Sequence, residues 1–136
     1  MARMSDQTAY TRKVLVVDDN PDLRTVFSRA FSRQDFEVRI AADGREAIAC
    51  LAESLPDVMI LDLNMPYVDG FGVLDDLRGR PGGDDVKVVV VSGNPIAARA
   101  PEAAKADLVL IKPVDLRELV LLARRLTPHK SGDVTV

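Results

Sequence analysis

Five side chains that could do chemistry each follow a short apolar run. Asp18 and Asp19 follow residues 14–17, Asp62 follows 58–61, Ser92 follows 88–91, and Lys112 follows 108–111. Continuous apolar runs of this length, bounded by polar or turn residues, fit parallel strands that are buried on both faces. Ligands of open α/β sheets bind at the carboxyl ends of the strands. We therefore expect the five side chains to meet at one edge of a sheet.

The predicted cluster suits a metal ion and a phosphoryl group. Carboxylates in close proximity repel, and the pKa of one must rise unless a cation compensates. Oxygen ligands without His or Cys suit Mg²⁺, which often shares a phosphate oxygen. A lysine and a hydroxyl can bind the remaining phosphate oxygens. Taken singly, the residues have simpler alternatives: loop acids near a helix N-terminus for Asp18 and Asp19, a solvated side chain for Lys112, and a helix cap for Ser92.

The rest of the pattern predicts the elements that position these residues. Strands are expected at residues 13–17, 36–41, 58–62, 87–91 and 108–111. Helices are expected from residue 21 through the apolar stripe that ends at residue 31, and at 44–55, 70–78, 95–105 and 116–126. Alternating strands and helices predict an α/β fold, with a five-stranded parallel sheet covered by helices on both faces. The flavodoxin-like order 2-1-3-4-5 suits this length and places the ends of strands 1 and 3 side by side.

Particular residues refine this pattern. The first helix should bury the stripe of Leu23, Val26, Phe27, Ala30 and Phe31, and the second the stripe of Ile48, Leu51, Ala52 and Leu55. Pro101 should make the fourth helix short or bent, because proline cannot donate to the helix and clashes with the preceding turn. The Lys112–Pro113 bond is a candidate cis peptide.

Composition limits the possible functions. The 136 residues are enough for one domain, and the net charge of −3 argues against nucleic acid as the main ligand. Cys50, the only cysteine, excludes an intramolecular disulfide and is expected to be buried. No apolar run approaches the roughly 20 residues of a membrane span, and no signal peptide is visible, so we expect a cytoplasmic protein. The domain should cover residues 12–127, with a flexible lead-in at 1–11 and a flexible tail at 128–136.

The pairs Asp18-Asp19, Ser92-Gly93 and Lys112-Pro113, together with the stretch 62–70, resemble the signature of the response-regulator receiver domain of two-component signalling. The similarity extends over about residues 11–126. It implies that the chain catalyses only its own phosphorylation and dephosphorylation, and is no enzyme for a separate substrate. The phosphoryl donor would be a phosphohistidine on a sensor histidine kinase or a histidine phosphotransfer protein.

The resemblance also assigns roles to residues. It implies that Asp62 is the phosphoacceptor and that Ser92 and Lys112 hold the phosphoryl oxygens. The implied Mg²⁺ ligands are Asp19, Asp62 and the backbone carbonyl of Asn64, with Asp18 acting through water. Asn64 and Asn94 would flank the attacking water, which suggests moderate self-hydrolysis of the phosphoryl group.

Departures from the family pattern concern the output. Val109 stands where the family usually has Tyr or Phe, and Val114 where Phe is common. We therefore expect signalling to rely on disorder or repositioning of the fourth helix. The output face would be formed by strand 4, helix 4, strand 5 and helix 5 and would contact a downstream protein. Leu121 falls opposite the core stripe of the last helix and could contact a partner or a second copy, in a monomer or a weak phosphorylation-dependent dimer. His129, the only histidine, lacks a helical context suited to phosphotransfer.

Four interpretations remain open. The favoured one is a single-domain receiver or phosphorelay intermediate. A receiver excerpted from a transcription factor or hybrid kinase would be recognised from a longer sequence. A phosphatase of the haloacid dehalogenase type would need Asp-x-Asp after the first strand, where this chain has Asp18-Asp19, and would turn over phosphoesters. A pseudo-receiver would only bind partners, although the complete set of acids, hydroxyl and lysine argues against it.

Overall fold

The computed structural model describes residues 11–65 and 68–128. Five strands of this part form one sheet: β2 (Arg12–Val17), β3 (Phe36–Ala41), β4 (Val58–Asp62), β5 (Lys87–Ser92) and β6 (Leu108–Ile111). All neighbouring strands are parallel, in the order β3-β2-β4-β5-β6. Numbered along the described chain, this is the predicted order 2-1-3-4-5.

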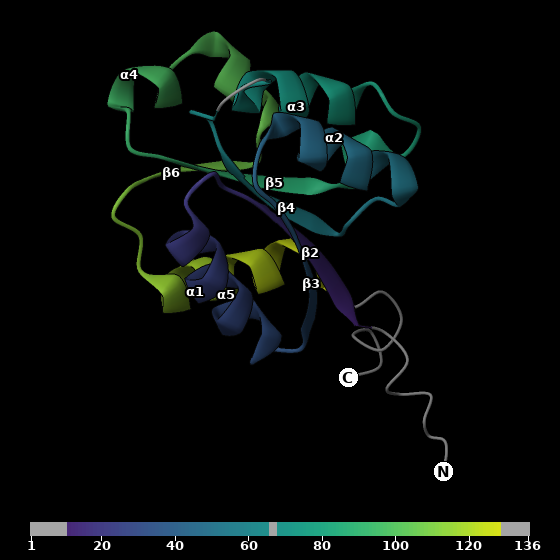
Figure 1. The fold of residues 1–136 in the computed structure, drawn as a ribbon, viewed down its shortest axis with the longest axis vertical. Helices are drawn as coiled ribbons and strands as arrows, with labels where there is room; N and C mark the ends of the chain where they lie inside the picture. The colour runs from purple at the N-terminus through teal and green to yellow at the C-terminus, as the bar shows by residue number, and fades with distance from the viewer. Residues whose placement is uncertain (1–10, 66–67, 129–136) are drawn as a thin grey trace.

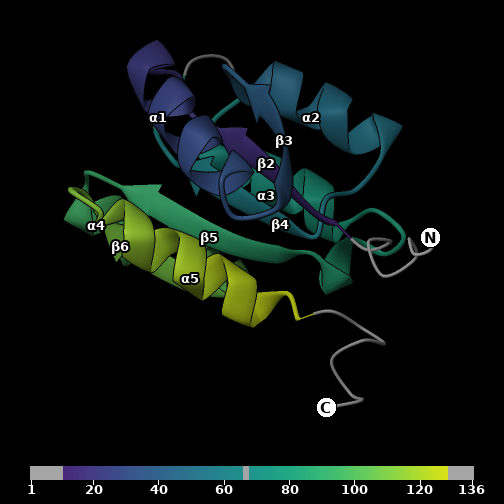
Figure 2. The ribbon, with the colours of Figure 1, turned by 90° about the horizontal axis from the view of Figure 1, so that it is seen from below.

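Helices cover both faces of the sheet, as the alternating pattern predicts. On one face lie α1 (Pro21–Ser32) and α5 (Leu116–Leu126), and on the other lie α2 (Gly44–Glu53), α3 (Gly70–Arg78) and α4 (Pro95–Ala98), as Figure 1 shows. Two short 3₁₀ helices, η2 (Gly83–Asp85) and η3 (Pro101–Lys105), precede β5 and β6. Figure 2 shows the face that carries α1 and α5. No helix in the described ranges is long and apolar enough to span a bilayer.

The three central strands, β2, β4 and β5, are buried on both faces, while the edge strands β3 and β6 are partly exposed. Every residue of β4 is buried, and the apolar residues of β2 and β5 from Val14 to Val17 and from Val88 to Val91 are at most 1% exposed. Phe31 and Phe36 pack edge to face at 5.0 Å beneath α1. Burial of these apolar side chains supplies the main favourable free energy of folding. The continuous apolar runs were therefore a reliable signal for a parallel sheet.

Three predictions of burial are wrong in detail. Val26 is 42% exposed, because α1 turns Phe27 and Phe31 toward the sheet and leaves Val26 at its edge. Ala52 is exposed because α2 buries Ala47 and Leu51 instead. Cys50 is only partly buried, and burial raises the pKa of its thiol.

The predicted weakness of the fourth helix is confirmed. α4 is four residues long and none of them is buried; the chain then passes into η3 at Pro101. Ile96, at 83% exposure, projects into solvent. The predicted flexible segments 1–11 and 128–136, with His129, lie outside the described residues except for Thr11 and Pro128. The domain limits at 12 and 127 remain predictions.

Arg78 ties α3 to the segments that lead into β5 and β6. Its guanidinium donates to the carbonyls of Gly83 and Val86 at 2.8 and 2.7 Å, and to the carbonyl of Lys105 at 2.8 and 3.1 Å. It also pairs with Asp107 at 3.4 Å. The Asp107 carboxylate in turn accepts from the Val88 amide at 2.8 Å. This network fixes the amino-terminal ends of the two strands.

We predict that Arg78→Met destabilises the fold far more than Arg80→Met. Loss of Arg78 leaves three carbonyl groups without their charged donor, at a cost of about 1.5–3 kcal/mol. Arg80 makes only an i,i+4 pair with Asp76, worth about 0.3–0.5 kcal/mol. Urea unfolding of both variants measures the difference. Equal costs would show that the network contributes nothing beyond a surface ion pair.

Candidate functional site

The acidic residues meet at the carboxyl edge of the sheet. Because β2 pairs with β4 in a register that places Val17 beside Leu61, Asp18 and Asp62 leave neighbouring strands at the same level. One carboxylate oxygen from each of Asp18, Asp19 and Asp62 lies within 4.8 Å of the other two. The predicted meeting of the three acids is confirmed.

Asp62 is the most constrained of the three carboxylates. It is 6% exposed, and its Oδ1 accepts from the Asn64 amide at 3.0 Å. Its Oδ2 lies 3.6 Å from the Lys112 ammonium. Burial raises the pKa of Asp62, and the charges of Asp18 and Asp19 raise it further. The Asn64 amide and Lys112 oppose this rise in pKa without cancelling it.

Lys112 bridges the two buried acids. Its ammonium lies 3.5 Å from Oδ2 of Asp18, which is 2% exposed, as well as 3.6 Å from Asp62. The predicted cis bond between Lys112 and Pro113 is present. Lys112 is therefore paired within the site, and the alternative of a solvated lysine is wrong. Asp19, by contrast, is exposed.

Ser92 reaches the same edge but is engaged elsewhere. It ends β5 and is fully buried. Its hydroxyl accepts from the Asn94 amide at 3.0 Å and donates to the Asn94 carbonyl at 3.3 Å. The side chain of Asn94 caps α4 by accepting from the amides of Ile96 and Ala97. The alternative role of Ser92 as the helix cap is therefore wrong.

Three other predicted residues do not belong to this cluster. Asn64 is exposed and follows Asp62 at the start of the β4–α3 loop. Val109 is partly buried and packs against the core on the side of α2 and α3. Leu121 is 50% exposed on α5, away from the carboxylates, as its helical position predicts.

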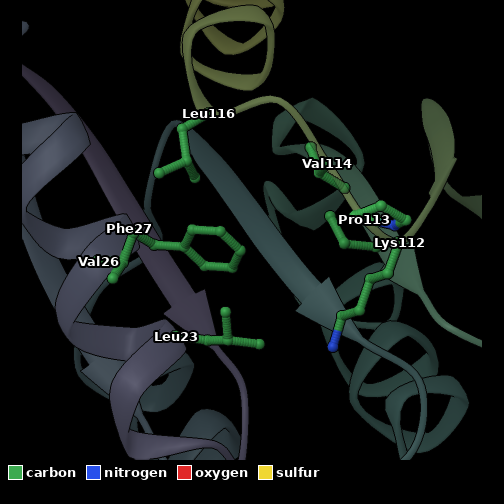
Figure 3. Close-up of a pocket in the computed structure, with 8 residues that line it drawn as sticks. Leu23, Val26, Phe27, Lys112, Pro113, Val114 and Leu116 are labelled. Carbon is green, nitrogen blue, oxygen red and sulfur yellow. The ribbon is translucent and has the colours of Figure 1, made fainter.

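An apolar cavity of about 480 Å³ adjoins the site between α1 and the loop after β6. Figure 3 shows Leu23, Val26 and Phe27 of α1 facing Val114 and Leu116, with Lys112 at one end. The exposed position of Val26 is explained by this cavity. The apolar surface of the cavity lies beside Lys112, which is paired with Asp18 and Asp62.

Sequence reasoning missed Arg24. Its Nη1 donates to the backbone carbonyl of Asp18 at 2.8 Å. Arg24 stands four residues after the cap residue Asn20, on a helix whose exposed side carries several charged residues. Spacing alone gives no signal that distinguishes such a contact from ordinary solvation.

The donor set fits a hard divalent cation. Three carboxylates share a small volume, and Lys112 alone is paired with two of them within the described chain. Mg²⁺ prefers oxygen ligands and usually keeps several waters, so a partly open acidic site suits it. The raised pKa of Asp62 shows that the folded chain does not itself fully stabilise this charge.

The fold and the acidic pocket define a receiver domain of two-component signalling. The model of the family described as "Response regulator receiver domain" matches residues 14–124, and the chain belongs to this family. Receiver domains partner with histidine kinases. The proposed identification from the residue pattern is thereby confirmed, and it sets the phosphatase interpretation aside.

Relatives and solved structures agree with this assignment. The transcriptional regulatory protein PrrA of Mycobacterium tuberculosis is 38% identical over 132 residues, which are 96% of this chain and 56% of PrrA. The chain thus spans about half the length of this relative. The chemotaxis response regulator CheY4 of Vibrio cholerae superimposes with a TM-score of 0.79 at 30% identity, over 86% of this chain and 99% of CheY4. The regulator TrrA of Thermotoga maritima, in complex with Mg²⁺-BeF, gives 0.78 at 25% identity, over 85% and 99%.

The raised pKa of Asp62 predicts a pH-dependent stability difference in metal-free buffer. At low pH the carboxyl is protonated in both the folded and unfolded states. As pH rises, it ionises first in the unfolded state, and above its folded pKa the folded protein carries the full cost of the buried charge. Asp62→Asn removes that charge and should make the fold more stable than wild type at pH 7, with the advantage shrinking as pH falls.

Urea unfolding with EDTA at several pH values measures this difference. Asp84→Asn serves as the control, because Asp84 is an exposed acid of η2. An advantage of Asp62→Asn that is independent of pH would contradict the assignment of the cost to the buried charge.

Proposed function

We propose that this chain accepts a phosphoryl group on Asp62 from a phosphohistidine of a sensor histidine kinase or a histidine phosphotransfer protein. The observation that carries the proposal is the gathering of Asp18, Asp19 and Asp62 within 4.8 Å, with Lys112 paired to two of them. Asp62 ends the central strand of the sheet. The other acids follow β2 on one side, and on the other side Ser92 ends β5 and Lys112 follows β6.

The reaction is an in-line phosphoryl transfer. A carboxylate oxygen of Asp62 attacks phosphorus, the phosphorus–nitrogen bond of the donor breaks, and the imidazole leaves with the electron pair of that bond. Lys112 exchanges its carboxylate contacts for the transferred phosphoryl oxygens and neutralises their charge. The apolar cavity beside Lys112 offers surface on which a donor protein can pack.

Asp19, Asp62 and the backbone carbonyl of Asn64 would hold Mg²⁺, with Asp18 contributing through water. When bound, the ion supplies charge neutralisation and alignment of the phosphoryl oxygens. The clustered oxygen donors support this set, and the related regulator TrrA has been solved in complex with Mg²⁺-BeF. Asn64 and Asn94 would flank the path of attacking water and permit moderate self-hydrolysis. The protein would act on its own acyl phosphate and on no separate substrate.

Output would pass through the face of β5, α4, β6 and α5. For Ser92 to bind the phosphoryl group, its hydroxyl must leave the amide and carbonyl of Asn94. Those hydrogen bonds lie at the start of α4, so the exchange would reposition the short helix. Val109 cannot provide an aromatic rotamer switch. A downstream protein would recognise the changed face, with Leu121 as a contact, and the chain would act in the cytoplasm as a monomer or a weak dimer.

The first test is intact mass after incubation with acetyl phosphate, with and without Mg²⁺. We expect one phosphoryl adduct on wild type that requires Mg²⁺, no adduct on Asp62→Asn, and an unchanged adduct on the control Asp84→Asn. No adduct on wild type under any condition would overturn the phosphotransfer mechanism and leave a pseudo-receiver. Repeated turnover of a simple phosphoester would instead indicate an enzyme.

The second test follows backbone amide exchange on phosphorylation. We expect exchange to change in residues 94–100, because loss of the Ser92–Asn94 hydrogen bonds frees the start of α4. The amides of η3, which is tied to α3 through Arg78, should change less. Unchanged exchange across α4 in protein shown by mass to be phosphorylated would rule out repositioning of this helix.

A further inference from the structure

Arg24 holds the peptide group that joins two of the acids. Its Nη1 donates to the carbonyl of Asp18 at 2.8 Å, and that carbonyl belongs to the peptide between Asp18 and Asp19. A peptide group is planar, so the direction of its carbonyl also fixes the direction in which the next residue departs. The contact therefore controls the backbone position from which the Asp19 side chain projects.

Asp19 depends on its backbone more than the other acids do. Asp18 and Asp62 each accept from a backbone amide, of Asn20 at 2.9 Å and of Asn64 at 3.0 Å, and both face Lys112. Within residues 11–65 and 68–128, no hydrogen bond or ion pair holds the exposed Asp19 carboxylate. Its place in the cluster is consequently set by the turn of residues 18–20.

Arg24 is itself fixed by the helix that begins at this turn. The side chain of Asn20 accepts from the amides of Asp22 and Leu23 at 2.8 and 3.2 Å and so starts α1. The Arg24 amide donates to the Asn20 carbonyl at 3.0 Å as part of the first helical turn. The guanidinium then returns to the Asp18 carbonyl, which connects the turn to the helix at a second point.

We propose that Arg24 is a positioning residue that orients Asp19 for Mg²⁺; the proposal rests on the metal site of the proposed function. Two roles of Arg24 predict opposite effects. If its positive charge mattered most, its removal would strengthen cation binding, because a like charge near the site would be gone. If its hydrogen bond to the Asp18 carbonyl matters most, its removal weakens binding. Loss of a residue that orients a metal ligand typically lowers metal affinity about 10–100-fold.

The test is calorimetric titration with MgCl₂ at constant ionic strength, in the absence of any phosphoryl donor. Arg24→Met keeps an unbranched apolar stem in place of the aliphatic part of the side chain and removes both the donor and the charge. Arg24→Lys keeps the charge and one possible donor. Arg29→Met is the matched control, because Arg29 is an exposed arginine of the same helix and the change in charge is identical. Urea unfolding first establishes that each variant is folded.

We expect Arg24→Met to weaken Mg²⁺ binding about 10–100-fold, Arg24→Lys to recover most of the loss, and Arg29→Met to bind like wild type. Equal affinities of Arg24→Met and Arg29→Met, or tighter binding by Arg24→Met, would overturn the positioning role. If Arg24→Met does not fold, Arg24→Lys and a second variant, Arg24→Gln, decide, and wild-type affinity in both would overturn it. Absence of Mg²⁺ binding by wild type would instead overturn the metal site on which the proposal rests.

Discussion

Mutual repulsion among three carboxylates is the constraint on which the rest of this structure depends. Asp18, Asp19 and Asp62 lie within 4.8 Å of one another, and Lys112 provides one paired positive charge. The fold must hold these groups together against a repulsion that favours their separation. It does so with amide donors to Asp18 and Asp62, while burial adds to the cost of the charge and raises the pKa of Asp62. The clustered carboxylates therefore lower the stability of the domain, and in return they form a site that favours a cation and a phosphoryl group.

The sheet supplies the rigidity that this arrangement requires. Its central strand is buried along its whole length, so Asp62 has little freedom to move away from its neighbours. At the start of α3, the Gly70 amide donates to the Leu63 carbonyl at 3.0 Å, which holds the helix close to the end of β4. A Cβ atom at Gly70 would lie 2.5 Å from the carbonyl oxygen of Asp62, so only glycine allows the helix to start this close to the site. Asp62 and Ser92 are therefore held at the ends of buried strands, while Asp18, Asp19 and Lys112 lie in the loops directly after β2 and β6.

The sequence predicts this site well because its parts are local. Apolar runs that end in a charged or hydroxyl residue locate the strands and the functional groups together, and the order of the sheet brings the groups to one edge. Contacts between distant side chains and backbone carbonyls carry no such periodic signal. Arg24 and Arg78 therefore escaped prediction, although each makes specific hydrogen bonds. The burial of Val26 and Ala52 was predicted wrongly because rotation of a helix about its own axis depends on the packing of larger neighbours such as Phe27 and Leu51.

The two ends of the segment between β5 and β6 are held by different contacts. The end next to β6 is held more firmly than the end next to β5. Its far end is fixed by Arg78, whose guanidinium bonds the Lys105 carbonyl and pairs with Asp107. Its near end depends on the hydrogen bonds between Ser92 and Asn94 and on the Asn94 cap, and α4 itself buries no residue. In the proposed switch, a change at Ser92 would therefore disturb the end next to β5, while the end held by Arg78 stays in place. Because Ser92 ends the strand beside β4, the residue proposed to release α4 lies next to the strand that carries the proposed phosphoacceptor.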